Sequence, residues 1–145
     1  MRPFVTDAVI VRDGGIVLIR RNNEPFKGML ALPGGFAEEG ETAEECCERE
    51  ALEETGLKVR ARKLVGVFSD PTRDPRGTIA GAYLCEVLGD ADGRLDAGNW
   101  KLRSGDDAKE AKWFSLNELP ELAFDHRKII EAGKKFIYAE RIRRL

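Results

Sequence analysis

The chain has 145 residues, of which 42% are hydrophobic and 34% charged, so we expect one globular domain over residues 1–145. The net charge of −2 shows no excess of positive charge of the kind that attracts nucleic acid, and we expect no nucleic-acid partner. There is no long apolar run, so we also expect no signal peptide, no membrane span and a cytoplasmic location.

The N-terminal part of the sequence predicts a β-hairpin. Phe4–Val11 is rich in β-branched residues, Ile16–Ile19 is a short apolar run, and Asp13-Gly14-Gly15 between them tolerates positive φ angles. A polar loop over Arg20–Gly28 should follow. The next short strand, Leu30–Leu32, should end at a Pro-Gly-Gly turn.

A helix with defined ends is predicted next. Thr42 and Glu45 match the S/T-x-x-E capping box, so the helix should begin near Ala43, and Gly56 suits a left-handed cap at its end. The elements expected after it are strands over Lys58–Phe68 and Thr78–Leu88, a loop over Ser69–Gly77, a polar loop over Gly89–Asp107, a strand over Ala111–Leu116, and a helix over His126–Ile142 capped by Asp125.

The helix places three glutamates, Glu50, Glu53 and Glu54, within five consecutive positions. Positions three and four apart share one helix face, where like charges repel. Oxygen ligands without nitrogen or sulfur suit a hard cation such as Mg²⁺ or Mn²⁺. The alternative is an acidic face exposed to solvent.

The wider spacing resembles the Nudix box. Gly35 is followed after five residues by Glu41, and after seven more by the segment Arg49–Leu57, which reads REALEETGL. The Nudix pattern is a glycine, five spacers, a glutamate, seven spacers and R-E-U-x-E-E-x-G-U, where U is aliphatic or small. Every defining position is filled, so the chain is identified as a member of this family.

The resemblance implies an α/β/α sandwich with a mixed β-sheet, the box helix on one side and the C-terminal helix on the other. It also implies metal-dependent hydrolysis of a nucleoside diphosphate linked to another group. Glu50, Glu53, Glu54 and the backbone carbonyl of Gly35 would hold the metal, and Arg49 would pair with Glu41. Relatives in the ADP-ribose branch of this family are commonly homodimers, so we expect a homodimer.

Two kinds of acidic residue are candidates for the group that deprotonates the attacking water. In some family members a box glutamate serves, here Glu53 or Glu54, and in others an acidic residue on a later loop does so. Asp107 is our first candidate on that loop and Glu110 the second. An ordinary acidic turn before a strand explains the same residues.

The segment Ser69–Gly77 bears on the substrate. Pro71 lies near the place of a proline typical of the ADP-ribose pyrophosphatases, and residues 122–126 also resemble that branch, although Leu30 and Thr78 depart from it. Arg73 and Arg76 suit phosphate or ribose oxygens. Alternatively, they pair with Asp70 and Asp74 in a surface turn.

Other side chains are weaker candidates for substrate contacts. Arg20 and Arg21 end a strand that should flank the cleft, and both are candidates for binding the diphosphate. Phe26 or Phe4 would stack on adenine or, alternatively, pack in the core. We expect His126 to help cap the last helix.

We therefore expect hydrolysis of ADP-ribose to AMP and ribose 5-phosphate. The alternatives are another nucleotide substrate, namely an oxidised nucleoside triphosphate, a dinucleoside polyphosphate or NADH, and a sensor that binds ADP-ribose without cleaving it. The intact box and the short region after it argue against the sensor.

Overall fold

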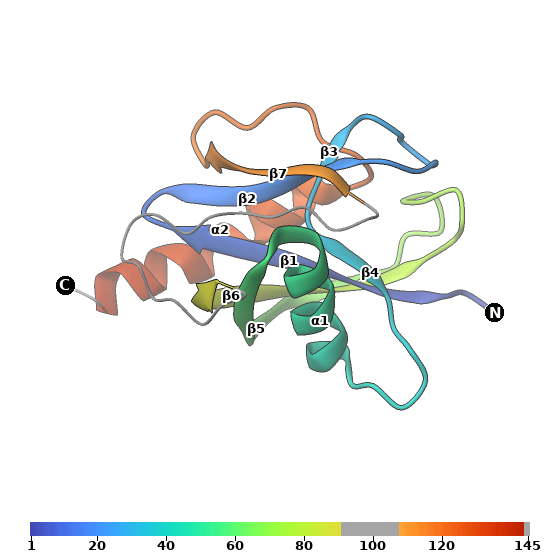
Figure 1. Ribbon diagram of the computed structural model, residues 1–145, viewed down its shortest axis with the longest axis horizontal. Helices are drawn as coiled ribbons and strands as arrows, with labels where there is room; N and C mark the ends of the chain where they lie inside the picture. The colour runs from blue at the N-terminus through green and yellow to red at the C-terminus, as the bar shows by residue number, and fades with distance from the viewer. Residues whose placement is uncertain (91–107, 144–145) are drawn as a thin grey trace.

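The computed structural model describes residues 1–90 and 108–143. Within these residues the chain forms seven strands and two helices (Figure 1). In chain order they are β1 (Phe4–Arg12), β2 (Gly15–Arg21), β3 (Leu30–Ala31), β4 (Gly34–Phe36), α1 (Ala43–Thr55), β5 (Leu57–Phe68), β6 (Ile79–Asp90), β7 (Ala108–Ser115) and α2 (His126–Arg143).

The sheet is mixed, with the order β3-β2-β1-β6-β5, and β4 pairs with β1 while β7 pairs with β2. β1 and β6 run parallel, from the pair Phe4 and Ile79 to the pair Ile10 and Cys85. The other strand pairings of the described residues are antiparallel. Because β1 pairs with β4 at its start, it holds the Pro-Gly-Gly turn beside the centre of the sheet.

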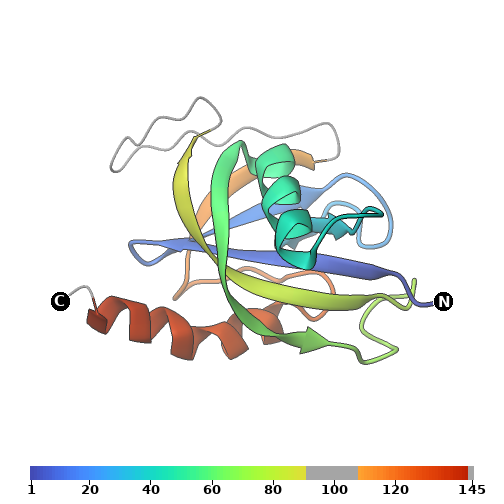
Figure 2. The ribbon, with the colours of Figure 1, turned by 90° about the horizontal axis from the view of Figure 1, so that it is seen from below.

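The two helices lie on opposite sides of the central strands (Figure 2). Successive β1 side chains point to opposite faces of the sheet. Ala8 and Ile10 belong to the core with Cys47 and Ala51 of α1, whereas Val9 belongs to the core with α2. This arrangement confirms the α/β/α sandwich with a mixed sheet. No helix in the described part of the chain is long and apolar enough to cross a bilayer.

Helix α1 has the ends that its sequence predicts. The Thr42 hydroxyl accepts a hydrogen bond from the Glu45 backbone N–H at 3.0 Å, and the Glu45 carboxylate accepts one from the Thr42 N–H at 2.9 Å. Gly56 has φ 74° and donates its N–H to the Leu52 carbonyl. These caps satisfy backbone groups that would otherwise lack partners, so they fix where the glutamates lie along the helix.

The region around the Pro-Gly-Gly turn differs from the prediction. The strand expected over Leu30–Leu32 ends at Ala31, and β4 was not predicted because glycine is depleted in strands. The structure explains Gly34 by the close approach of β4 to β1, because a Cβ at Gly34 would clash with the Thr6 carbonyl oxygen. Glycine therefore lets β4 lie tightly against β1.

Candidate active site

A cavity of about 400 Å³ lies among the start of β1, the end of β2, β4, α1 and the segment between β5 and β6. Acidic and basic side chains both line it. The acidic side chains include Asp7, Glu50 and Glu54, and the basic side chains include Arg21, Arg73 and Arg76.

Glu50 and Glu54 lie one helical turn apart and both reach this cavity from α1. The Gly34 N–H donates to Glu54 Oε1 at 3.0 Å. A Cβ at Gly35 would lie 2.5 Å from the carboxyl carbon of Glu50. The absence of a side chain at Gly35 therefore makes room for the Glu50 carboxylate against β4, and the Gly34 N–H fixes that of Glu54.

Burial raises the pKa of both carboxyl groups, and that of Glu54 is raised well above its ordinary value. The hydrogen bond from Gly34 acts in the opposite direction at Glu54, but the nearby charge of Glu50 adds to the effect of burial. Two buried carboxylates side by side repel each other when both are ionised. A positive charge between them would relieve that repulsion.

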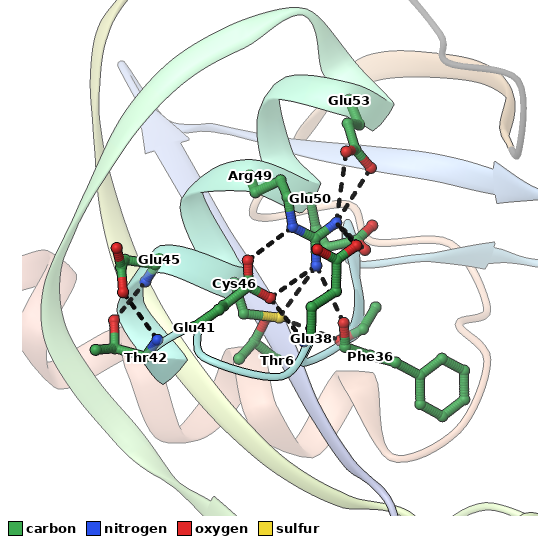
Figure 3. Close-up of polar contacts among 11 residues, drawn as sticks. Thr6, Phe36, Glu38, Glu41, Thr42, Glu45, Cys46, Arg49, Glu50 and Glu53 are labelled. Carbon is green, nitrogen blue, oxygen red and sulfur yellow. Dashed lines mark hydrogen bonds and ion pairs between the residues drawn. The ribbon is translucent and has the colours of Figure 1, made fainter.

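Glu53 does not join this pair. Its side chain is 56% exposed, and its carboxylate lies 3.3 Å from Arg49 Nη1 (Figure 3). The same Nη1 donates to Glu50 Oε1 at 2.9 Å. Of the three predicted metal ligands, Glu50 and Glu54 line the cavity and Glu53 does not, although Arg49 Nη1 links Glu53 to Glu50. The i,i+4 spacing explains the difference, because Glu53 faces Arg49 whereas Glu54 faces Glu50.

The predicted pairing of Arg49 with Glu41 is present. Arg49 Nε donates to Glu41 Oε2 and Nη2 to Glu41 Oε1, each at 2.8 Å, and Nη2 also donates to the Phe36 carbonyl at 3.1 Å (Figure 3). The pKa of Glu41 falls to about 2, chiefly because of the hydrogen bond from Arg49. Arg49 thus fixes α1 to the segment that follows β4.

The two arginines at the end of β2 have different positions. Arg21 lines the cavity, but Arg20 is not part of its lining. Arg20 Nε donates to Glu110 Oε1 at 2.9 Å, and this hydrogen bond lowers the pKa of Glu110. Glu110 is likewise not part of the cavity lining. Asp107, the other candidate base, lies outside the described residues.

Arg73 and Arg76 both line the cavity, and they pair differently from each other. Arg76 pairs with Asp74 at 2.9 Å, as the surface-turn alternative predicted. Arg73 is buried and does not pair with Asp70. It donates from Nε and Nη2 to the two oxygens of Asp125, at 3.0 and 2.8 Å, and from Nη1 to the Thr78 hydroxyl.

Asp125 and His126 do not have the capping roles that we expected. The Asp125 carboxylate binds Arg73 through both oxygens. His126 Nδ1 accepts a hydrogen bond from the Leu32 N–H at 2.9 Å, and its Nε2 lies 3.4 Å from Asp7 Oδ1. Both side chains therefore connect the start of α2 to distant segments at the cavity, which local sequence patterns do not reveal.

Asp7 is a cavity residue that sequence reasoning missed. It is 5% exposed, and its Oδ2 is buried without a hydrogen bond among the described residues, although Arg73 Nη2 lies 3.7 Å away. The available signal was an aspartate within the otherwise mainly apolar strand Phe4–Arg12. Of the two phenylalanines considered for stacking, Phe26 packs edge to face on Phe124 at 4.8 Å, and Phe4 does not line the cavity.

The donor set fits a hard divalent cation. No three His, Cys, Asp or Glu side chains in the described residues are gathered closely enough to form a complete metal site. Glu50 and Glu54 nevertheless provide adjacent carboxylates at the cavity, which Gly35 also lines, and the Gly35 carbonyl accepts a hydrogen bond from the Cys46 thiol at 3.6 Å. Oxygen donors of this kind suit Mg²⁺ or Mn²⁺ and disfavour softer metals.

Known proteins are similar to this chain over most of its length. The NUDIX domain profile matches residues 1–133. An ADP-ribose pyrophosphatase of Methanocaldococcus jannaschii is 52% identical over 126 residues, which is 86% of this chain and 69% of that protein.

Two solved structures are also similar. A bifunctional NMN adenylyltransferase/ADP ribose pyrophosphatase of Francisella tularensis, complexed with AMP and a manganese ion, is 28% identical with a TM-score of 0.73, over 93% of this chain and 42% of that one. The NUDIX domain of Shewanella oneidensis NrtR, complexed with ADP ribose, is 25% identical with a TM-score of 0.75, over 94% of this chain and 89% of that one.

Proposed function

The chain belongs to the Nudix family, and we propose that it hydrolyses the pyrophosphate bond of ADP-ribose, with water, to AMP and ribose 5-phosphate. The observation that carries this proposal is the arrangement of charge in one cavity. Glu50 and Glu54 offer a cation site on α1, and Arg21 and Arg76 line the same cavity. A diphosphate requires both a metal and cationic donors to offset its charge.

We propose Mg²⁺ or Mn²⁺ as the cofactor, held by Glu50, Glu54 and the Gly35 carbonyl, with Glu53 as a further ligand. When bound, such a metal offsets the charge of the diphosphate oxygens and lowers the pKa of the attacking water. Arg21 and Arg76 would bind and orient the phosphates. Arg73 is committed to Asp125 and Thr78, so we assign it to holding the cavity wall.

The general base stays a prediction. Asp107 is the first candidate on the later loop. Glu110 is weaker, because its carboxylate already accepts a hydrogen bond from Arg20 and pairs with Lys112. A base must reach the water from which it takes the proton, so a carboxylate committed to an arginine outside the cavity is poorly placed.

The choice of ADP-ribose rests on the segment between β5 and β6 and on the relatives. That segment brings Arg76 and Asp74 to the cavity beside Phe36, whose ring lies 5.0 Å from Arg76 Cζ. The Methanocaldococcus relative is named for ADP-ribose pyrophosphatase activity, and the Shewanella NUDIX domain was solved with ADP ribose. Both relatives support ADP-ribose as the ligand, and the name of the Methanocaldococcus relative supports catalysis over sensing.

We also propose a homodimer in the cytoplasm. Leu64 and Val67 on β5 are 46% and 60% exposed, and β5 is an edge of the sheet in the described residues. Exposed apolar side chains on an edge strand are typical of subunit contacts. Three buried free cysteines suit a reducing compartment. Light scattering coupled to gel filtration measures the oligomeric state, and a monomeric mass would contradict the dimer.

The proposed activity is tested by a substrate screen with Mg²⁺. AMP and ribose 5-phosphate release phosphate to an added phosphatase, whereas intact ADP-ribose, NADH and diadenosine polyphosphates have no terminal phosphate, so phosphate release reports their cleavage. Nucleoside triphosphates lose phosphate to the phosphatase directly, so inorganic pyrophosphatase replaces it for them and reports release of pyrophosphate. The panel compares ADP-ribose, NADH, diadenosine polyphosphates, and ordinary and oxidised nucleoside triphosphates. We expect a clear preference for ADP-ribose. Preference for another nucleotide would overturn the substrate, and binding of ADP-ribose without turnover would favour the sensor.

A further inference from the structure

We propose that Phe124 is a positioning residue whose ring holds the guanidinium groups of Arg21 and Arg76 together to receive the two phosphates of the substrate. This inference rests on the function proposed above and adds a role for a residue that touches neither the metal ligands nor the reacting bond.

The ring of Phe124 contacts both arginines. Arg21 Cζ lies 4.9 Å from the ring centroid, and Arg76 Cζ lies 5.7 Å from it. All three residues line the cavity that contains Glu50 and Glu54. The π face of an aromatic ring carries partial negative charge and attracts cations at these distances. The ring therefore offers one attractive surface to two cations from distant parts of the chain.

Each arginine is anchored through part of its guanidinium only. Arg21 Nε donates to the Pro25 carbonyl at 2.7 Å, and Arg76 donates from Nε and Nη2 to Asp74. Nη1 of each makes no hydrogen bond to any part of the chain that the structure describes. Each guanidinium thus keeps a free nitrogen donor, and a diphosphate has one phosphate for each of them.

Bringing the two cations together is electrostatically unfavourable without an anion. Burial lowers the pKa of Arg21, and the nearby charge of Arg76 lowers it further, while Glu54, Asp74 and Asp7 act in the opposite direction. A bound diphosphate would relieve the repulsion between the arginines. The ring contacts allow the pair to exist before the substrate arrives.

The backbone of Phe124 also points to a use for its ring. Phe124 has φ 54° and its neighbour Phe26 has φ 61°, in the left-handed region that side chains with a Cβ disfavour. The two rings meet edge to face with centroids 4.8 Å apart. Glycine would adopt this backbone more easily, so what the position gains from phenylalanine is the ring. Strained residues of this kind cluster at binding sites.

Two substitutions at Phe124 distinguish the effect of the aromatic ring from the effect of an apolar side chain that fills the same space. Phe124→Leu keeps an apolar side chain without a π face, and Phe124→Tyr keeps the ring. We expect Phe124→Leu to raise the KM for ADP-ribose on the order of tenfold with kcat nearly unchanged, and Phe124→Tyr to stay close to wild type. A purely structural role would instead lower kcat and the melting temperature together.

Phe136→Leu is the matched control. The ring of Phe136 lies 5.1 Å from Lys63 Nζ and 5.0 Å from Lys135 Nζ, but it does not line the cavity. This substitution also removes a ring that contacts two cations, and it should leave the KM unchanged. Melting temperatures measured for all three variants show whether each one is folded.

Calorimetric binding of inorganic pyrophosphate separates this inference from the proposed substrate. If wild type binds pyrophosphate about tenfold more tightly than Phe124→Leu but does not cleave ADP-ribose, the substrate is wrong and the role of Phe124 stands. If wild type and Phe124→Leu bind pyrophosphate equally, or neither binds it, the role of Phe124 is overturned, whatever the substrate is.

Discussion

The guanidinium of Arg49 and the carboxylate of Glu41 form a two-point ion pair, with Nε to Oε2 and Nη2 to Oε1 both 2.8 Å. The Glu41 side chain is 14% exposed and that of Arg49 24%, so the pair is partly shielded from water. Such fork geometry is specific to arginine. The pair of Arg49 and Glu41 sets the distance between α1 and the segment after β4. It therefore also sets the position of the glutamates on α1 relative to Gly34 and Gly35.

Removing this pair should make stability depend differently on pH. The Glu41 pKa is about 2 in the folded protein, against an ordinary value of 4.5. Because the folded pKa is lowered, the pair stabilises fully above pH 4.5, and this stabilisation is lost as the pH falls through about 2. Glu41→Gln should therefore melt below wild type at pH 7, and the difference should shrink at pH 2 to 3. A constant difference at both pH values would contradict this assignment.

A lysine at position 49 should not fulfil the role of Arg49, so we expect Arg49→Lys to be impaired. A lysine keeps the charge but cannot donate simultaneously in fork geometry to Glu41 and to the Phe36 carbonyl. We expect a lower melting temperature and reduced turnover, because Glu50 loses the hydrogen bond that fixes its carboxylate. Equal activity of Arg49→Lys and wild type would show that charge alone suffices.

Glu54→Gln should raise the melting temperature of the metal-free protein and lower its turnover with Mg²⁺. Glu54 is buried beside Glu50, and burial raises its pKa, so its charge destabilises the metal-free fold. The neutral amide should melt higher than wild type in a chelator at pH 7.5, while turnover with Mg²⁺ falls by on the order of a hundredfold or more. Unchanged turnover would contradict the metal-site assignment.

Glu53→Gln separates the half-exposed glutamate from the buried pair. Its carboxylate contacts Arg49 at the surface, so its loss should change the melting temperature little. If Glu53 is a metal ligand, turnover should nevertheless fall strongly, and a higher Mg²⁺ concentration should partly restore it. A titration of rate against Mg²⁺ measures this, and identical curves for wild type and Glu53→Gln would exclude Glu53 from the site.

Asp107→Asn tests the general base. We expect a large fall in kcat with little change in substrate affinity, since a base acts on the water and does not bind the nucleotide. Glu110→Gln is the comparison, because Glu110 pairs with Arg20 outside the cavity, and we expect it to change kcat much less. The reverse order of effects would make Glu110 the base.

The sequence predicted the parts of the site that depend on local spacing. The capping box and the left-handed Gly56 follow from residues close in the sequence, whereas the pairing of Arg49 with Glu41 came from the resemblance to the Nudix box. The sequence did not predict β4, because Gly34 is explained only by the approach of β1, and Gly35 only by the approach of the Glu50 carboxylate. Contacts such as His126 to Asp7 and Arg73 to Asp125 join segments 119 and 52 residues apart, which no local pattern encodes.

The most direct test of the central claim is to incubate the protein with ADP-ribose and Mg²⁺ in ¹⁸O-labelled water and identify the products by mass spectrometry. We predict AMP and ribose 5-phosphate in equal amounts, with one labelled oxygen on a phosphate. Neither product should form when the metal is chelated, and Glu54→Gln should form both on the order of a hundredfold more slowly. Release of ADP and ribose, or cleavage that persists in the chelator, would contradict metal-dependent hydrolysis of the pyrophosphate bond.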